Sequence, residues 1–158
     1  MNSITERLLN LVAGWKGNFT GAYSVRENGQ CSELHSTEQI RLVPKKEQPG
    51  LEIHILPGTR GEMVSIPACV THGDVDDLVY NDFFVGEGAE VTIIAGCGVH
   101  LETGELARHS GVHRFFLEEN AHVVCEEKHV GTGEGEGLRS IDPVTEIHLK
   151  RGAVLQME

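Results

Sequence analysis

Positive charge is scarce in this sequence. Lysine and arginine together number 13, against 24 aspartates and glutamates, and the formal net charge is -11. Nucleic acids and anionic membranes are bound through patches of Lys and Arg, whereas the basic residues here are scattered along the chain. The composition therefore argues against nucleic acid or membrane as a partner. It leaves proteins, metals and small molecules.

Long apolar runs and paired cysteines are also missing. No apolar segment approaches the roughly 20 residues of a membrane-spanning helix. The N-terminal segment carries Glu6 and Arg7, so it does not have the pattern of a signal peptide. The four cysteines stand alone, without a CxxC pair or the density of a secreted disulfide framework. We therefore expect reduced thiols and a cytoplasmic location.

Glycine is abundant, with 19 residues, and together with a hydrophobic content of 39% it favours a turn-rich domain over a helical fold. One short helix is expected over residues 3–13, where apolar residues recur on one helical stripe and Ser3 with Glu6 resembles a capping box. Its apolar face is expected to pack on the body of the protein or on a partner. We therefore predict that the chain consists of an N-terminal helical segment, residues 1–17, and a β domain, residues 18–158.

Short alternating segments follow the helix. Glu27-Asn28-Gly29 predicts a hairpin turn between two strands. Further strands are expected at 51–56 and 62–70, the second interrupted by Pro67. They resemble one irregular coil of a repeating structure.

The segment from Val70 to Asp82 is the most acidic in the chain. Its carboxylates, with His72, could bind a divalent cation. The alternative is an acidic loop whose carboxylates accept backbone hydrogen bonds. The acidic residues concerned are Asp74, Asp76, Asp77 and Asp82.

A repeat of fixed length organises the C-terminal half. Three alanines recur at equal intervals, each after a residue suited to a left-handed backbone conformation: Gly88-Ala89, Asn120-Ala121 and Gly152-Ala153. Apolar residues alternate in register on both sides of each pair. Such a period is typical of one supersecondary unit stacked on copies of itself. The sequence therefore predicts an all-β fold of the β-solenoid type, with the short N-terminal α-helix attached.

The alternation also predicts which residues face the core. Odd-numbered positions from Ala89 to Cys97 are small or apolar and should point inward, and the next coil keeps this parity up to Cys125. It then places Glu127 and His129 where Ala95 and Cys97 stood one coil earlier. A carboxylate and an imidazole on an inward face are costly unless they are paired, hydrogen-bonded or bound to metal. A departure of this kind from the pattern marks a candidate functional site.

Cys97 and His129 occupy equivalent positions in successive coils, so their backbones should lie about 4.8 Å apart. A thiolate and an imidazole at that separation could share one metal ion, with His100 and Cys125 near enough to be further ligands. The alternative is that the cysteines are small buried hydrophobic residues and that His129 pairs with Glu127.

Four other features have structural interpretations. His109 and His113 are expected at a solvated corner, with a metal role as the alternative. The segment 131–137, rich in glycine and glutamate, is expected to be a flexible corner and not a nucleotide-binding loop. A strand should restart at Val144, and its open edge predicts self-association. Cys31 is expected far from the interior of the repeat.

Three stretches of the sequence resemble the core of the SufB/SufD family, in particular the short SufB-like proteins of archaea and anaerobic bacteria. They are VTHGDVDDLVYNDFFVGEGAEVTIIAGCGVH, HSGVHRFFLEENAHVVCEEKHVGTGEGEG and RSIDPVTEIHL. The resemblance covers nearly the whole chain. It implies a right-handed parallel β-helix that carries iron–sulfur clusters during their assembly, with an ABC-type ATPase of the SufC kind as partner. Family members continue through further coils and a C-terminal helical segment, so we expect this chain to be the N-terminal portion of such a protein.

The resemblance also bears on the site. Family members have a cysteine and polar residues lining the interior of the β-helix, and Cys97, Glu127 and His129 match that description in kind. We therefore expect a non-enzymatic scaffold in which Cys97 or Cys125 accepts sulfur or binds iron and His129 binds through a neutral nitrogen. Glu127 would orient that imidazole or relay its proton.

The partners expected from the resemblance are the ATPase and a second SufB/SufD-type subunit or another copy of the chain. Two other functions remain open. One is a metalloenzyme of β-helical or cupin-like build that uses the histidines as a hydrolytic or isomerase site. The other is a structural solenoid that mediates subunit contacts.

Overall fold

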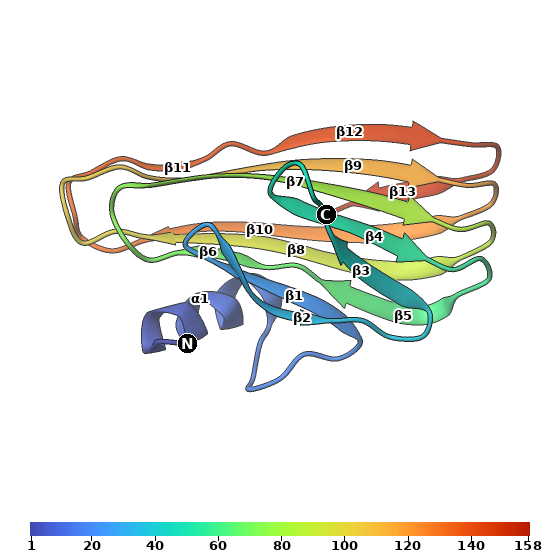
Figure 1. Cartoon of the computed structure of the whole chain (residues 1–158), viewed down its shortest axis with the longest axis horizontal. Helices are drawn as coiled ribbons and strands as arrows, with labels where there is room; N and C mark the ends of the chain where they lie inside the picture. Colours follow the sequence, from blue (N-terminus) through green and yellow to red (C-terminus); the bar gives the residue numbers. More distant parts are fainter.

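The strands of the C-terminal half pair with the strands one coil earlier, at the interval of the alanine repeat. His122–Thr132 lies parallel to Glu90–His100, and His100 pairs with Thr132 at an offset of 32 residues. Ala107–Leu117 lies parallel to Val75–Val85 with the same offset. This computed structural model describes all 158 residues of the chain. It is a parallel β-solenoid with one N-terminal helix, as the sequence predicts (Figure 1).

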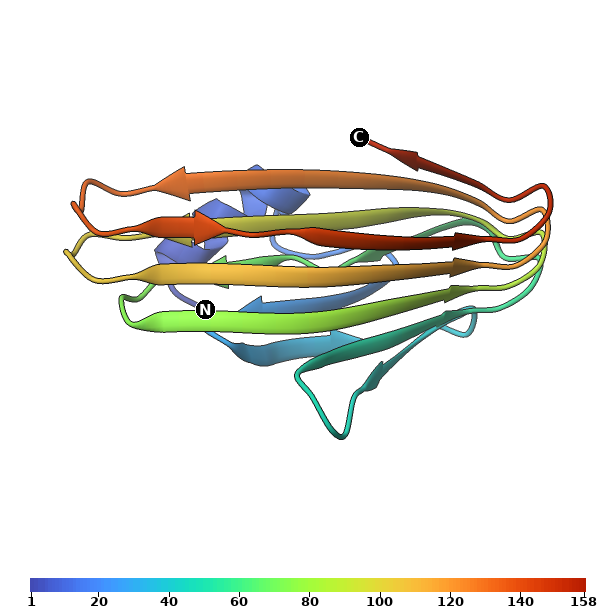
Figure 2. The same cartoon turned by 90° about the horizontal axis from the view of Figure 1, so that it is seen from above.

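Two sheets form the walls of the solenoid. The first consists of β1 (Ala22–Glu27), β2 (Gln30–His35), β5 (Arg60–Ser65), β6 (Ala68–Val70), β8 (Glu90–His100), β10 (His122–Thr132) and β13 (Val154–Met157). The second consists of β3 (Ile40–Pro44), β4 (Gly50–Ile55), β7 (Val75–Val85), β9 (Ala107–Leu117), β11 (Arg139–Ile141) and β12 (Val144–Leu149). Figure 2 shows β4, β7, β9 and β12 side by side in the order of the sequence.

The alanine turns stack as the repeat predicts. The backbone N–H of Ala89, Ala121 and Ala153 donates in each case to the carbonyl three residues earlier. The residue after each alanine then bonds to the coil before it: His122 N–H donates to the Ala89 carbonyl, and Val154 N–H to the Ala121 carbonyl. The alignment of the three alanines along one axis is therefore confirmed.

The first coil is shorter and less regular. β4 pairs with β7 at an offset of 30 residues, beginning with Gly50 opposite Tyr80. Thr59 occupies the position of the alanine, because its carbonyl accepts from Glu90 N–H. The expected interruption at Pro67 separates β5 from β6. The hairpin prediction is also correct: β1 and β2 are antiparallel, and Asn28 and Gly29 both have positive φ.

The helix α1 (Ser3–Ala13) has the expected bounds but a different cap. Asn2 and not Ser3 is the N-cap, and its side chain accepts a hydrogen bond from Thr5 N–H. The helix packs on the outer face of β8, as Figure 1 shows, so the expected packing on the body of the protein is confirmed. No helix in the structure has both the length and the apolar character needed to cross a membrane.

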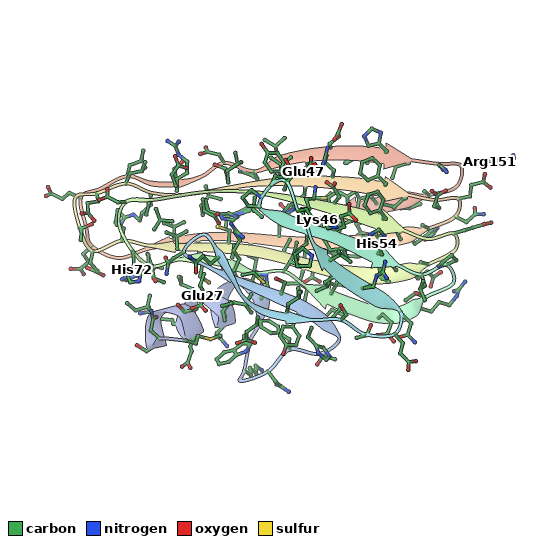
Figure 3. The ribbon with its side chains drawn as sticks, viewed as in Figure 1. Glu27, Lys46, Glu47, His54, His72 and Arg151 are labelled. Carbon is green, nitrogen blue, oxygen red and sulfur yellow. The ribbon has the colours of Figure 1, made fainter.

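The acidic segment consists of a turn at residues 71–74 and the first part of a strand. Val75–Val85 forms β7, and the side chains of Asp77 and Asp82 are buried. Both carboxylates accept hydrogen bonds from cationic side chains, so the interpretation as a loop with backbone hydrogen bonds is wrong. His72, labelled in Figure 3, lies at the turn between β6 and β7. Formation of the strand separates the residues of the expected cation site between the interior and the surface.

The interior of the solenoid has two apolar parts. The larger cluster of 19 buried residues includes Ile93, Phe83 and Phe115 near the alanine turns. The smaller cluster surrounds Val99 and Leu101 at the other end of β8. Between them the inward positions of the strands carry polar side chains, and the candidate site lies there.

Candidate functional site

A cavity of about 190 Å³ lies in this polar middle section of the solenoid. Both sheets contribute to its walls, because the inward faces of β8, β9 and β10 meet there. Its titratable and nucleophilic lining residues are Ser24, Arg26, Cys31, Lys45, Cys97, His109, His113, Glu127 and His129. Gly96 and Gly111 also border it. The cavity therefore gathers thiol, imidazole, carboxylate and cationic groups within the protein.

Cys97 and His129 are Cα partners of β8 and β10, as the repeat predicts. The Cys97 side chain is buried, and burial raises the pKa of its thiol far above the ordinary value. The side chain of His129 is 36% exposed. The pair thus combines a protonated, buried thiol with an imidazole that solvent can reach.

Glu127 connects two histidines. Its Oε1 lies 3.2 Å from Nδ1 of His113, and its Oε2 lies 3.5 Å from Nε2 of His129. The hydrogen bond from His113 lowers the pKa of Glu127 and outweighs the effect of burial, so the carboxylate is ionised. The expected pairing of Glu127 with His129 is present, but the shorter contact is with His113.

The expected position of His109 and His113 is wrong. They do not occupy a solvated corner; both lie on the inward face of β9 and line the cavity. His109 is buried, and its Nδ1 lies 2.9 Å from Oδ2 of Asp77 on β7. Arg26 on β1 donates two further hydrogen bonds to the same carboxylate.

These residues could have been found from the repeat. Asp77 and His109 are 32 residues apart, so they are Cα partners in successive coils. His109 and His113 also share their parity with the inward-facing Phe115. The glycine at position 111 suggests a corner in the sequence, whereas β9 continues through it as an 11-residue strand.

The other proposed ligands lie elsewhere. His100 does not line the cavity: its Nδ1 bonds to Oγ1 of Thr132 at 2.8 Å, and its Nε2 lies 3.0 Å from Oε1 of Glu102. Cys125 is fully buried in the larger apolar cluster, where burial raises the pKa of its thiol to about 12. The structure brings together Cys97, Glu127 and His129 of the predicted set, and leaves His100 and Cys125 outside. Three or more His, Cys, Asp or Glu side chains do not converge anywhere as a ready metal site.

Cys31 is closer to the site than the sequence predicts. It borders the same cavity as Cys97, and its Sγ lies 3.5 Å from Oγ of Ser24. The expectation that Cys31 lies far from the interior is therefore wrong. Cys69 is buried in a separate cluster with Leu8, Leu9 and Val25, which makes it the better reference cysteine.

The chain was also compared with known proteins. No family model matches it, and neither the curated proteins nor the solved structures include a match.

Proposed function

We propose that this protein is a scaffold component for the assembly of iron–sulfur clusters. The observation that carries the proposal is the pairing of Cys97 and His129 on adjacent strands, facing one cavity that Glu127 also lines. Thiolate and imidazole groups are suitable ligands for iron. The cluster is the cargo of such a protein and not a resident cofactor.

The resemblance of three sequence stretches to the SufB/SufD family supports the same proposal. The β-solenoid agrees with the fold that the family implies. An ABC-type ATPase of the SufC kind, a second subunit of the SufB/SufD type or a second copy, and a cytoplasmic location belong to the proposal on the same basis. The protein itself would not be the catalyst, since ATP hydrolysis would belong to the partner.

The cavity suggests how its residues would act. Iron binding at Cys97 requires loss of the thiol proton, and the positive charge of the ion offsets the penalty that burial places on the thiolate. His129 would bind through a neutral nitrogen. Glu127, held ionised by His113, would orient the imidazole and accept the proton as the S–H bond is exchanged for an Fe–S bond. Sulfide or groups of a partner subunit would supply the remaining ligands.

Anaerobic reconstitution with ferrous iron and sulfide tests the proposal. Absorption and Mössbauer spectra should reveal a bound cluster in the wild type and in Cys69→Ala. The Cys97→Ala variant should lose most of the bound cluster. Its free energy of unfolding should fall by only about 1 to 2 kcal/mol. His129→Ala should reduce retention as well. Equal retention of iron and sulfide by Cys97→Ala and Cys69→Ala would rule out Cys97 as a ligand.

The contact of one carboxylate with two imidazoles favours a second candidate, a metal-dependent hydrolase or isomerase. Glu127 would then act as an acid or base beside His113 and His129. Tightly bound zinc, and activity without sulfide, would distinguish it from the scaffold. A purely structural solenoid would retain its partner binding and cellular function in all the Cys and His variants.

A further inference from the structure

The position of the missing Cβ atom of Gly111 lies between two histidines on the inward face of β9. A Cβ atom built on Gly111 would lie 3.4 Å from Nε2 of His109 and 3.4 Å from Nε2 of His113. Both Nε2 atoms therefore approach one point in the cavity. Any larger residue at position 111 would occupy that point.

The opposite nitrogen of each ring is held by a carboxylate. Nδ1 of His109 lies 2.9 Å from Asp77, and Nδ1 of His113 lies 3.2 Å from Glu127. An ionised carboxylate can only accept a hydrogen bond, so each Nδ1 carries the proton. In the neutral imidazole the lone pair is then on Nε2, the atom that faces the space above Gly111.

No protein group forms a hydrogen bond with either Nε2, since the hydrogen bonds of both rings are made through Nδ1. His109 is nevertheless buried. Histidines that bind metal usually have one ring nitrogen hydrogen-bonded to a carboxylate and the other nitrogen free to bind the ion. The carboxylate fixes the tautomer and makes the imidazole a stronger ligand. The two carboxylates come from different sheets, so the arrangement depends on the closed solenoid.

We propose that His109 and His113 bind a divalent first-row transition metal ion through their Nε2 atoms, above Gly111. Imidazole nitrogens bind such ions at about 2.0 to 2.1 Å. The ion therefore lies closer to each Nε2 than the Cβ position of Gly111 does, within the cavity that both rings line. Water or another small ligand completes the coordination.

This site is separate from the Cys97–His129 pair and needs neither sulfide nor a cluster. Its only shared residue is Glu127, which positions His113 here and orients His129 in the proposed scaffold. The site therefore does not depend on the proposed function. The two can be tested with different variants.

Titration of the metal-free protein with Co²⁺ alone, under anaerobic conditions, tests the inference. Visible absorption reports coordination, and equilibrium dialysis reports affinity and stoichiometry. The variant His109→Gln/His113→Gln should bind Co²⁺ at least about tenfold more weakly. His122→Gln, at an exposed position of β10, is the matched control and should bind as the wild type does. Unchanged affinity in the double variant would overturn the inference.

Gly111→Ala provides a second test that leaves both imidazoles in place. The added methyl group would be in ordinary contact with the two Nε2 atoms, and Gly111 does not have a positive φ, so the fold should accept alanine. The methyl group nevertheless lies in contact with both Nε2 atoms and would hinder the approach of an ion to them. Co²⁺ affinity should fall about as far as in the double variant, and wild-type affinity in a folded Gly111→Ala protein would contradict the proposed position.

The variant Cys97→Ala/His129→Ala separates the two proposals. It should keep its Co²⁺ affinity if the ion is bound by His109 and His113. Loss of Co²⁺ binding in this variant alone would assign the metal to Cys97 and His129. That outcome would reject the inference and leave the proposed scaffold function standing.

Discussion

Asp77 and His109 face each other on neighbouring strands, with Oδ2 of Asp77 2.9 Å from Nδ1 of His109. Arg26 donates to both oxygens of the same carboxylate at 2.7 and 2.8 Å. The three residues belong to β1, β7 and β9. One buried carboxylate thus connects the irregular N-terminal strands to the regular coils and positions an imidazole at the cavity.

Asp77→Asn should lower the free energy of unfolding at pH 7 by about 2 to 3 kcal/mol, because the partly buried Arg26 loses its charged partner. Chemical denaturation measures the loss. Asp76→Asn is the control, because the Asp76 carboxylate is exposed and its contact with Arg108 is longer, at 3.6 Å. It should cost less than about 0.5 kcal/mol. Equal losses in the two variants would show that the buried pair makes no special contribution.

The pH dependence of the same pair has a definite sign. Burial raises the pKa of Asp77, but hydrogen bonds from His109 and Arg26 outweigh it and lower the pKa from 3.8 to about 2. The carboxylate therefore contributes stability above pH 3.8, and this contribution is lost as the pH falls toward 2. The difference in stability between wild type and Asp77→Asn should be constant from about pH 5 to 7. It should shrink below about pH 4, as acid titrations of unfolding would show.

Gly96→Ala should loosen the contact of α1 with β8. A Cβ on Gly96 would lie 2.4 Å from the carbonyl oxygen of Val12, which forces the helix to move. The expected loss of stability is about 1 to 3 kcal/mol. Fluorescence of Trp15, the single tryptophan, should change because it packs against the cluster beneath the helix.

Gly104→Ala is the matched control for this variant. No atom lies within 4 Å of a Cβ built on Gly104, and its φ is not positive. Its stability and fluorescence should match the wild type. A Gly96→Ala protein with unchanged fluorescence would mean that the helix accommodates the methyl group.

The stacked alanines should respond unequally to enlargement. Ala121 is fully buried between two coils, so Ala121→Val should cost about 1 to 3 kcal/mol through overpacking. Ala153 is only partly buried, so the same change there should cost less. Thermal unfolding of both variants measures the difference. A larger loss at Ala153 would contradict the packing described for the two turns.

The regular coils of the fold could be predicted from the amino-acid sequence. The constant interval between the alanines predicted the pairing of β8 with β10, because identical units stacked in parallel place equivalent residues opposite one another. Parity then predicted that Cys97 faces inward with Ala95 and that Glu127 follows them in the next coil. Asn28-Gly29 predicted the hairpin from its backbone preference alone.

The repeat interval also relates Asp77 to His109. Asp77 and His109 are separated by the same interval as the alanines and pair on neighbouring strands. The acidic composition around Asp77 and the glycine near His109 are nevertheless typical of loops. Composition is a weak guide where a charged residue finds a partner inside the fold. Burial of Asp77 is possible only because Arg26 and His109 neutralise and hydrogen-bond it.

The sequence does not predict which polar residues share the cavity, because they come together through contacts between the two sheets. Glu127 on β10 reaches His113 on β9 across the interior, and Arg26 reaches Asp77 from 51 residues away. These contacts depend on the spacing of the two sheets and on the irregular first coil, neither of which has a periodic signal in the sequence. The repeat defines neighbours along each sheet, whereas contacts across the interior depend on how the closed solenoid brings its two walls together.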